Sequence, residues 1–249
     1  MIDLHSHVLP GIDDGARTLD ESLDILRAAV EDGITQIAAT PHVHPSFPTA
    51  PETMEAGVAA VATAAREAGI DIELLPGGEL DCVVAQSLDD STLRRFGLGG
   101  NPGLLLVETP LQGWPLDLGE LLFQLRARGF RLVLAHPERN AEVQEDPERL
   151  RPIVDAGVLV QLTAASVDGR LGRAQASASR ALLDARLAHL IASDAHAPAV
   201  RAIGMTAAAE AVGDDALARW LTHDVPAALL AGVPAPERPQ KSRLRLRRH

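Results

Sequence analysis

The sequence is poor in residues that several common protein functions require. Its 249 residues include no tyrosine, two tryptophans and four phenylalanines, which argues against aromatic platforms that stack nucleic-acid bases. The single cysteine, Cys82, excludes an internal disulfide framework and a cysteine-cluster metal site. No apolar run reaches the roughly 18–20 residues that span a bilayer. The polar opening residues also lack the apolar stretch of a secretory leader, so we expect a cytoplasmic protein.

Charge is distributed unevenly along the chain. The net charge is −11, yet residues 238–249 hold six of the 23 basic residues and no acid. The rest of the chain is therefore strongly acidic, which argues against a nucleic-acid partner. Hydrophobic residues make up 46% of the sequence, enough for a full core built from Ala, Leu, Val and Ile. We expect one domain over residues 1–235 and a basic, disordered tail over residues 236–249.

Short apolar segments alternate with longer segments of helical periodicity, a pattern typical of repeated βα units. Four glycines, Gly33, Gly69, Gly129 and Gly157, stand where a helix gives way to a strand. The expected strands cover residues 2–5, 36–40, 70–75, 104–108, 132–136, 158–163 and 190–193. The clearest helices cover residues 19–31, 51–68, 116–128 and 174–188. About seven such units predict an α/β fold with a parallel-stranded, TIM-like barrel.

Imidazole and carboxylate side chains follow most of these strands. Because the carboxyl ends of barrel strands meet at one mouth, we expect these side chains to share a single site there. The candidates are His5, His7, His42, Glu79, Glu108, His136, Asp194 and His196, with Asp14 in the loop after the first strand. So many ligands exceed what one ion takes, which favours two or three divalent ions.

The types of side chain indicate the chemistry. Imidazole and carboxylate ligands without thiolate suit manganese, iron or zinc. Clustered ions of this kind generate hydroxide near neutral pH and hold the oxygens of a displacement at phosphorus. Arg139 and Arg201 follow two of the histidines, and a guanidinium matches a phosphate dianion. The thiolate phosphatase loop is missing, because Leu88 stands six residues after Cys82 where that loop has arginine.

Several motifs together resemble the PHP (polymerase and histidinol phosphatase) superfamily. They are His-Ser-His, Gly-Ile-Asp-Asp-Gly, Ala-Thr-Pro-His, Gly-Gly-Glu-Leu, His-Pro-Glu-Arg-Asn and Ser-Asp-Ala-His, in family order. The sequence is most similar to the bacterial metal-dependent protein-tyrosine phosphatases associated with capsule and exopolysaccharide genes. The resemblance implies a distorted seven-stranded (β/α) barrel with a trinuclear, usually manganese, centre. It also implies the nine ligands above, with Arg139 and Arg201 on the substrate phosphate.

The same resemblance implies a partner. Members of this branch dephosphorylate the tyrosine-rich tail of a membrane-bound bacterial tyrosine kinase that controls polysaccharide export. This chain departs from the family at Asn140, where tyrosine is common, and in the loop over residues 42–48. We expect both positions on the rim of the site.

Two other functions remain open from the sequence. One is a PHP phosphatase for a small phosphorylated metabolite such as histidinol phosphate, and the other is a non-catalytic, metal-stabilised scaffold. The basic tail could bring the protein to the inner face of an anionic membrane. The sequence leaves the oligomeric state open.

Overall fold

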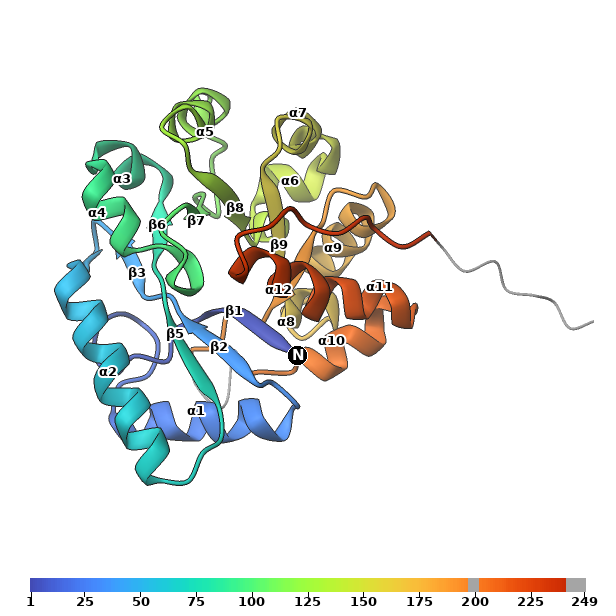
Figure 1. Cartoon of the computed structure of the whole chain (residues 1–249). Coiled ribbons are helices and arrows are strands. Elements are labelled where there is room, and N and C mark those ends of the chain that lie inside the picture. The colour runs from blue at the N-terminus through green and yellow to red at the C-terminus, as the bar shows by residue number, and fades with distance from the viewer. Residues whose placement is uncertain (197–201, 241–249) are drawn as a thin grey trace, which may run out of the picture.

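Parallel strands surrounded by helices form the body of the protein, as the computed structural model shows over residues 1–196 and 202–240 (Figure 1). The strands are β1 (Ile2–Ser6), β2 (Gln36–Ala39), β3 (His42–His44), β4 (Phe47–Pro48), β5 (Glu73–Pro76), β6 (Glu79–Asp81), β7 (Leu104–Glu108), β8 (Arg131–Ala135), β9 (Leu159–Thr163) and β10 (Leu190–Ala192). The α-helices are α1 (Leu19–Glu31), α2 (Pro51–Glu67), α3 (Cys82–Ser87), α4 (Asp90–Arg95), α5 (Leu118–Ala127), α6 (Ala141–Glu145), α7 (Arg151–Asp155), α8 (Ala164–Val167), α9 (Arg173–Asp184), α10 (Met205–Val212), α11 (Asp215–Arg219) and α12 (Val225–Leu230). Single turns η1 (Leu98–Gly100), η2 (Pro137–Arg139) and η3 (Pro147–Leu150) are 3₁₀ helices, and η4 (Trp220–Asp224) is π-helical.

The strands pair as two sheets. One has the order β1-β2-β5, and the other has the order β10-β9-β8-β7-β6-β3-β4. All pairs are parallel except β3 with β4, which form a short antiparallel hairpin. The expected α/β fold with parallel strands is therefore confirmed. The strand pairing does not confirm a single closed barrel.

The predicted secondary structure agrees well with the observed elements. Each of the seven expected strands and each of the four expected helices has a counterpart, and the four punctuating glycines all have positive φ. The third strand begins at Glu73 rather than at residue 70. The reason is that the Ile70 N–H bonds back to the Ala65 carbonyl at 2.9 Å and completes the end of α2.

Three short strands were not expected. β3 and β4 follow β2 after Pro41, which has no N–H to continue the ladder. β6 follows β5 after the pair Gly77 and Gly78. β3 and β6 thus lie beyond the ends of the expected strands, residues 36–40 and 70–75.

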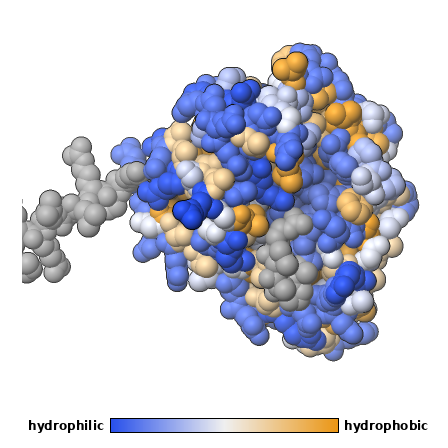
Figure 2. Space-filling model, turned by 180° about the vertical axis from the view of Figure 1, so that it is seen from behind, coloured by the Kyte–Doolittle hydropathy of each residue, from blue (hydrophilic) through white to orange (hydrophobic). Residues whose placement is uncertain are grey.

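The interior is aliphatic, as the low aromatic content predicts. Its fully buried side chains are mostly Leu, Ile, Val and Ala, with Phe96 the largest. The face seen in Figure 2 is largely hydrophilic, with small separate hydrophobic spots. Within the described ranges, no helix has the length and apolar character needed to cross a bilayer.

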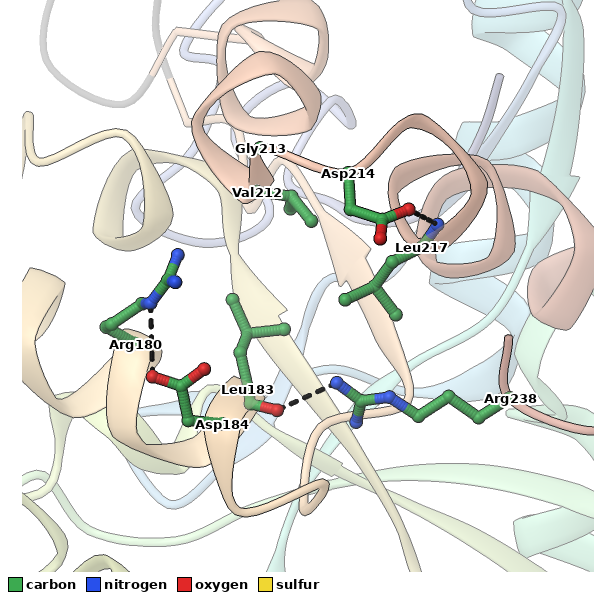
Figure 3. A pocket seen from close by; sticks show the side chains of 8 residues that line it. All are labelled: Arg180, Leu183, Asp184, Val212, Gly213, Asp214, Leu217 and Arg238. Carbon is green, nitrogen blue, oxygen red and sulfur yellow. Dashed lines mark hydrogen bonds and ion pairs between the residues drawn. The ribbon is translucent and has the colours of Figure 1, made fainter. Parts of the chain in front are cut away.

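Residues 236–238, expected to begin the tail, pack on the body. The Trp220 indole N–H donates to the Pro236 carbonyl at 2.9 Å. The Arg238 guanidinium donates to the Leu183 carbonyl at 2.7 Å, beside the Arg180–Asp184 ion pair of α9 (Figure 3). Ordered packing therefore extends three residues past the expected boundary at 235, and residues 241–249 lie outside the described ranges.

A histidine at the start of β10 makes folding stability depend on pH. His189 Nδ1 accepts the Val160 N–H at 3.1 Å, and its ring lies 6.4 Å from that of Trp220. Burial, and then the charge of Arg238, lower the pKa of His189 to about 4. The unfolded chain binds this proton near pH 6.5, so the stabilising contribution is complete above pH 6.5 and is lost as the pH falls through 4.

We predict that the free energy of unfolding falls more steeply from pH 7 to pH 4 in the natural chain than in a His189→Gln variant. The difference should be about 2 kcal/mol. Glutamine keeps an acceptor for the Val160 N–H but does not titrate. Urea unfolding at both pH values measures the effect, and parallel pH profiles would contradict it.

Candidate metal centre

Two histidines at the end of β1 begin the site. His5 and His7 are buried, and their Nε2 atoms lie 3.2 Å apart. Residues two apart on a strand point to the same face, so the pair enters the site together. Both Nε2 atoms also face one carboxylate oxygen, Glu79 Oε2, at 3.3 Å from His5 and 3.2 Å from His7.

Glu79 connects this pair to histidines on two other elements. His42 Nδ1 lies 3.0 Å from Glu79 Oε2, and His136 Nε2 lies 2.8 Å from Glu79 Oε1. The strand register explains the proximity, because β3 pairs His42 with Glu79 and β6 pairs Asp81 with Glu108. Glu108 Oε2 in turn lies 3.6 Å from His42 Nδ1.

Two loop segments, one after β10 and one after β1, complete the cluster. Asp194, after β10, places Oδ1 3.4 Å from His7 Nε2. Asp14, in the loop after β1, places Oδ1 3.1 Å from His196 Nε2 and 3.4 Å from His42 Nε2. Asp14 is the most exposed member, since 46% of its side chain is accessible.

The structure brings all nine candidate ligands together. They form four overlapping groups, within each of which the ligand atoms lie within 4.8 Å of one another. The groups are His7, Asp14, His42 and His196; His5, Glu79 and His136; His5, His7 and Asp194; and His42, Glu79 and Glu108. The convergence expected from the sequence is thus observed, and the ligand roles stay a prediction.

The donor atoms fit divalent cations. Glu79 Oε2 and His42 Nδ1 are buried and 3.0 Å apart, yet neither makes a hydrogen bond of acceptable geometry, as expected where two lone pairs are directed at a common third atom. Burial, and then the charge of Glu79, raise the pKa of Glu108 to about 8. The neighbouring imidazoles therefore do not fully balance the charge of this one buried carboxylate. Burial, and then Arg139, lower the pKa of His136 to about 4, which leaves a neutral imidazole suited to a metal.

Backbone strain also concentrates here. Among the described residues, the non-glycine residues with positive φ are His136, Arg186 and Asp194, and two of them are candidate ligands. His136 (φ 31°) follows β8 and Asp194 (φ 52°) follows β10. This conformation is unfavourable for side chains other than glycine and recurs at functional sites.

Arg139 is the arginine that the structure places at the centre. It lies in η2, three residues after His136, and donates from a terminal nitrogen to Asp194 Oδ2 at 2.7 Å. Its side chain is 17% exposed. Arg201, the other arginine expected to bind phosphate, lies outside the described residues.

Cys82 is a buried packing residue, as expected. It begins α3 and is 1% exposed. Burial, and then Asp81, raise the pKa of the Cys82 thiol to about 11. The thiol therefore stays protonated at neutral pH and is a poor nucleophile.

The two positions that depart from the family pattern lie in different environments. The loop over residues 42–48 forms the β3–β4 hairpin, whose partly exposed Phe47 stacks on His42 with ring centres 5.7 Å apart. Asn140, expected on the rim, is instead buried. Its Oδ1 caps α6 and its Nδ2 donates to the Pro110 carbonyl at 2.7 Å, so it joins the loop after β7 to the segment that carries Arg139.

Sequence reasoning missed two residues that contact the histidines from outside the cluster. Asp13 Oδ2 lies 2.8 Å from His7 Nδ1, and Gln161 Oε1 lies 3.0 Å from His5 Nδ1. The doubled aspartate of Gly-Ile-Asp-Asp-Gly was a signal for Asp13. For Gln161, the signal was a single amide between Val160 and Leu162 in an otherwise apolar strand.

One glycine permits the loop after β1 to approach His7. A Cβ atom at Gly15 would lie 2.1 Å from the His7 carbonyl oxygen and 2.4 Å from the His7 Cβ. Both are rigidly placed atoms of β1, so a side chain at residue 15 would push away the loop that carries Asp14. At Gly119 in α5, by contrast, a Cβ would meet nothing within 4 Å.

We predict that Gly15→Ala lowers the free energy of unfolding by about 1–3 kcal/mol and weakens Mn²⁺ binding. Gly119→Ala, the matched control, should be neutral or stabilising by about 0.5–1 kcal/mol because alanine favours the helix. Urea unfolding and equilibrium dialysis measure the two effects. Equal behaviour of the two variants would show that the close approach does not matter.

Comparisons with known proteins agree with the resemblance noted in the sequence. The chain is 34% identical over 197 residues to the tyrosine-protein phosphatase YwqE of Bacillus subtilis (strain 168), covering 79% of this chain and 77% of that protein. It is 28% identical over 203 residues to the tyrosine-protein phosphatase CpsB of Streptococcus agalactiae serotype III (strain NEM316), covering 79% and 83%.

A solved structure and a family model extend the similarity to nearly the whole chain. The structure comes from work on YwqE of Bacillus subtilis and CpsB of Streptococcus pneumoniae, described as unique metal-dependent tyrosine phosphatases. It superposes with a TM-score of 0.86 at 29% identity and covers 97% of this chain and 100% of its own. The family model for capsular polysaccharide synthesis, CpsB/CapC, matches residues 1–230. The chain belongs to the CpsB/CapC family of capsular polysaccharide synthesis.

Proposed function

We propose that this protein is a metal-dependent phosphomonoester hydrolase that removes phosphate from tyrosine side chains of a bacterial tyrosine kinase regulating capsule or exopolysaccharide synthesis. The observation that carries the proposal is the convergence of nine imidazole and carboxylate side chains beside Arg139. Family membership supports the same conclusion, since the relatives YwqE and CpsB are tyrosine-protein phosphatases.

The proposed cofactor is two to three divalent ions, with manganese first and iron or zinc as alternatives. Imidazole and carboxylate ligands without thiolate support this choice. Glu79 would help to hold the ions, because its two oxygens face different histidines. Bound divalent ions supply a hydrolytic nucleophile from water near neutral pH and neutralise charge on a phosphoryl group.

The chain's own residues would bind and orient the phosphate. Arg139 offers further N–H donors beyond the one used on Asp194, and a planar guanidinium matches two phosphate oxygens at once. Arg201 is proposed for the same role from the residue pattern. A tyrosine leaving group has a pKa near 10, so it needs less protonation than an alkoxide. Cys82, with its raised pKa, would take no part, so no cysteinyl-phosphate intermediate is expected.

We also propose that the two sheets form one distorted seven-stranded barrel with the metal centre at its mouth. Backbone hydrogen bonds support closure between β1 and the segment after β10, from Asp194 to His5 at 2.9 Å and from His7 to Ala195 at 2.8 Å. On the other side, Glu79 donates to Pro41 at 3.1 Å across the interruption of β2 and β3. The seven strands would be β1, β2 with β3, β5 with β6, β7, β8, β9 and β10.

The proposed partner is the phosphotyrosine tail of a membrane-bound kinase, met in the cytoplasm. We further propose one phosphatase domain, expected over residues 1–235 and packed as far as Arg238, with a basic tail after it. Five basic residues follow Arg238 in residues 241–249. Clustered positive charge of this kind attracts anionic lipid at about 1 kcal/mol per residue near the surface, which would bring the enzyme to its kinase.

Metal dependence is the first prediction of this proposal. Metal-stripped protein should release phosphate from a phosphotyrosyl peptide only after Mn²⁺ is added, and alkylation of thiols should not change the rate. Histidinol phosphate assayed beside the peptide distinguishes the small-metabolite alternative. Bound Mn²⁺ without release from either substrate would favour the scaffold and contradict the proposal.

Arg139→Ala should lower kcat/KM for the phosphotyrosyl peptide by about 100- to 1000-fold, the usual effect of removing one preorganised donor from a reacting group. Its Mn²⁺ content should stay at the natural level, because Arg139 is not proposed as a ligand. Parallel metal analysis and kinetics test both statements. Loss of metal in proportion to activity would show that Arg139 serves only to hold Asp194.

A further inference from the structure

The carboxylate of Asp13 receives hydrogen bonds from three directions. Oδ2 accepts from His7 Nδ1 at 2.8 Å and from the His42 backbone N–H at 3.0 Å, while Oδ1 accepts from the Gly15 N–H at 2.9 Å. The side chain is 1% exposed. Asp13 therefore joins the end of β1, the loop that follows it and the start of β3.

These contacts meet in the ligand group of His7, Asp14, His42 and His196, although His7 and His42 each belong to a second group as well. Asp13 bonds to the side chain of His7 and to the backbone of His42, and it directly precedes Asp14. We propose that Asp13 is the positioning residue that assembles this one group. The inference rests on the metal centre of the proposed function.

The orientation of His7 follows from the chemistry of the carboxylate. An ionised carboxylate only accepts hydrogen bonds, so His7 must carry its proton on Nδ1. The lone pair on Nε2 then faces inward, where Glu79 Oε2 lies 3.2 Å away and Asp194 Oδ1 lies 3.4 Å away. Groups that hold the outer nitrogen of a ligating imidazole in this way typically change metal affinity 10- to 100-fold.

Gln161 holds the outer nitrogen of His5, which belongs to different ligand groups from Asp14. This buried amide on β9 places Oε1 3.0 Å from His5 Nδ1. His5 belongs to the groups with Glu79 and His136 and with His7 and Asp194, and is absent from the group that contains Asp14. Asp13 thus acts on the Asp14 side of the cluster and Gln161 on the His5 side, and the two sides share His7.

An asparagine cannot replace Asp13 without loss. Both carboxylate oxygens of Asp13 face N–H donors, whereas an amide offers one oxygen and one NH₂ group. In Asp13→Asn the NH₂ group must face an N–H donor in either orientation. It faces the Gly15 N–H in one orientation, and His7 and the His42 N–H in the other. Asp214, which caps α11 by accepting the Leu217 N–H at 3.1 Å, lies in the separate pocket of Figure 3 and provides a matched control.

The experiment compares the full-length natural chain with Asp13→Asn, Gln161→Met and Asp214→Asn. Equilibrium dialysis against a Mn²⁺ series, followed by elemental analysis, gives the number of bound ions and their affinities. We expect Asp13→Asn to weaken one binding step at least tenfold and to weaken the others less, because His7 is shared with a second group. Gln161→Met should weaken a different step, and Asp214→Asn none.

Two outcomes would overturn the inference. One is natural Mn²⁺ affinities at every step in Asp13→Asn, and the other is a uniform loss at all steps. Absence of Mn²⁺ binding by the natural chain would instead contradict the metal centre itself, so the two failures are distinguishable.

A second experiment uses the natural chain, so its result does not depend on whether a variant folds. Zn²⁺-loaded protein is diamagnetic, and long-range ¹H–¹⁵N spectra of its imidazoles report which ring nitrogen carries the proton. We expect His7 to carry it on Nδ1 and to bind Zn²⁺ through Nε2. Coordination of Zn²⁺ by Nδ1 of His7 would overturn the role assigned to Asp13.

Discussion

The carboxylate of Glu79 is the contact on which the rest of the site depends. It is wholly buried, and its two oxygens lie within 3.3 Å of nitrogens from four histidines. A buried carboxylate is costly unless positive charge or donors surround it. The four imidazoles meet this requirement together with the cations that the site is proposed to hold. The imidazoles come from elements that are far apart in the sequence. Glu79, at the start of β6, therefore connects the ends of β1 and β8 with the start of β3.

The fold carries conformational costs around this centre. His136 and Asp194 adopt left-handed backbone conformations, and Gly15 accepts a contact with His7 that no other residue could make. Such positions cost free energy and persist when the surrounding packing determines them. Here the surroundings are a buried, mainly aliphatic core and parallel strands that pair around the cluster. The packing of the core and strands thus holds His136 and Asp194 in their unfavourable backbone conformations.

Much of this arrangement could be predicted from the sequence, because its signals are local. Apolar strands, helix-ending glycines and strand-end ligands can each be recognised within a few residues. β3 and β6 could not be predicted in this way, since three-residue strands have no periodicity and their pairing is set by distant segments. Asn140 was misplaced for a similar reason. Its burial depends on the loop after β7, where its side chain donates to the Pro110 carbonyl. Asp13 and Gln161 likewise contact His7 and His5, and the contact of Gln161 with His5 joins residues far apart in the sequence.

One buried carboxylate, Glu79, is proposed to organise a cluster of several metal ions. Anomalous diffraction at the manganese edge from crystals grown with Mn²⁺ tests it most directly, because it locates each ion independently of activity. We expect at least two ions, with Glu79 bound to more than one of them and Asp14 bound to an ion shared with His42 or His196. A single ion, or several ions none of which contacts Glu79, would contradict it.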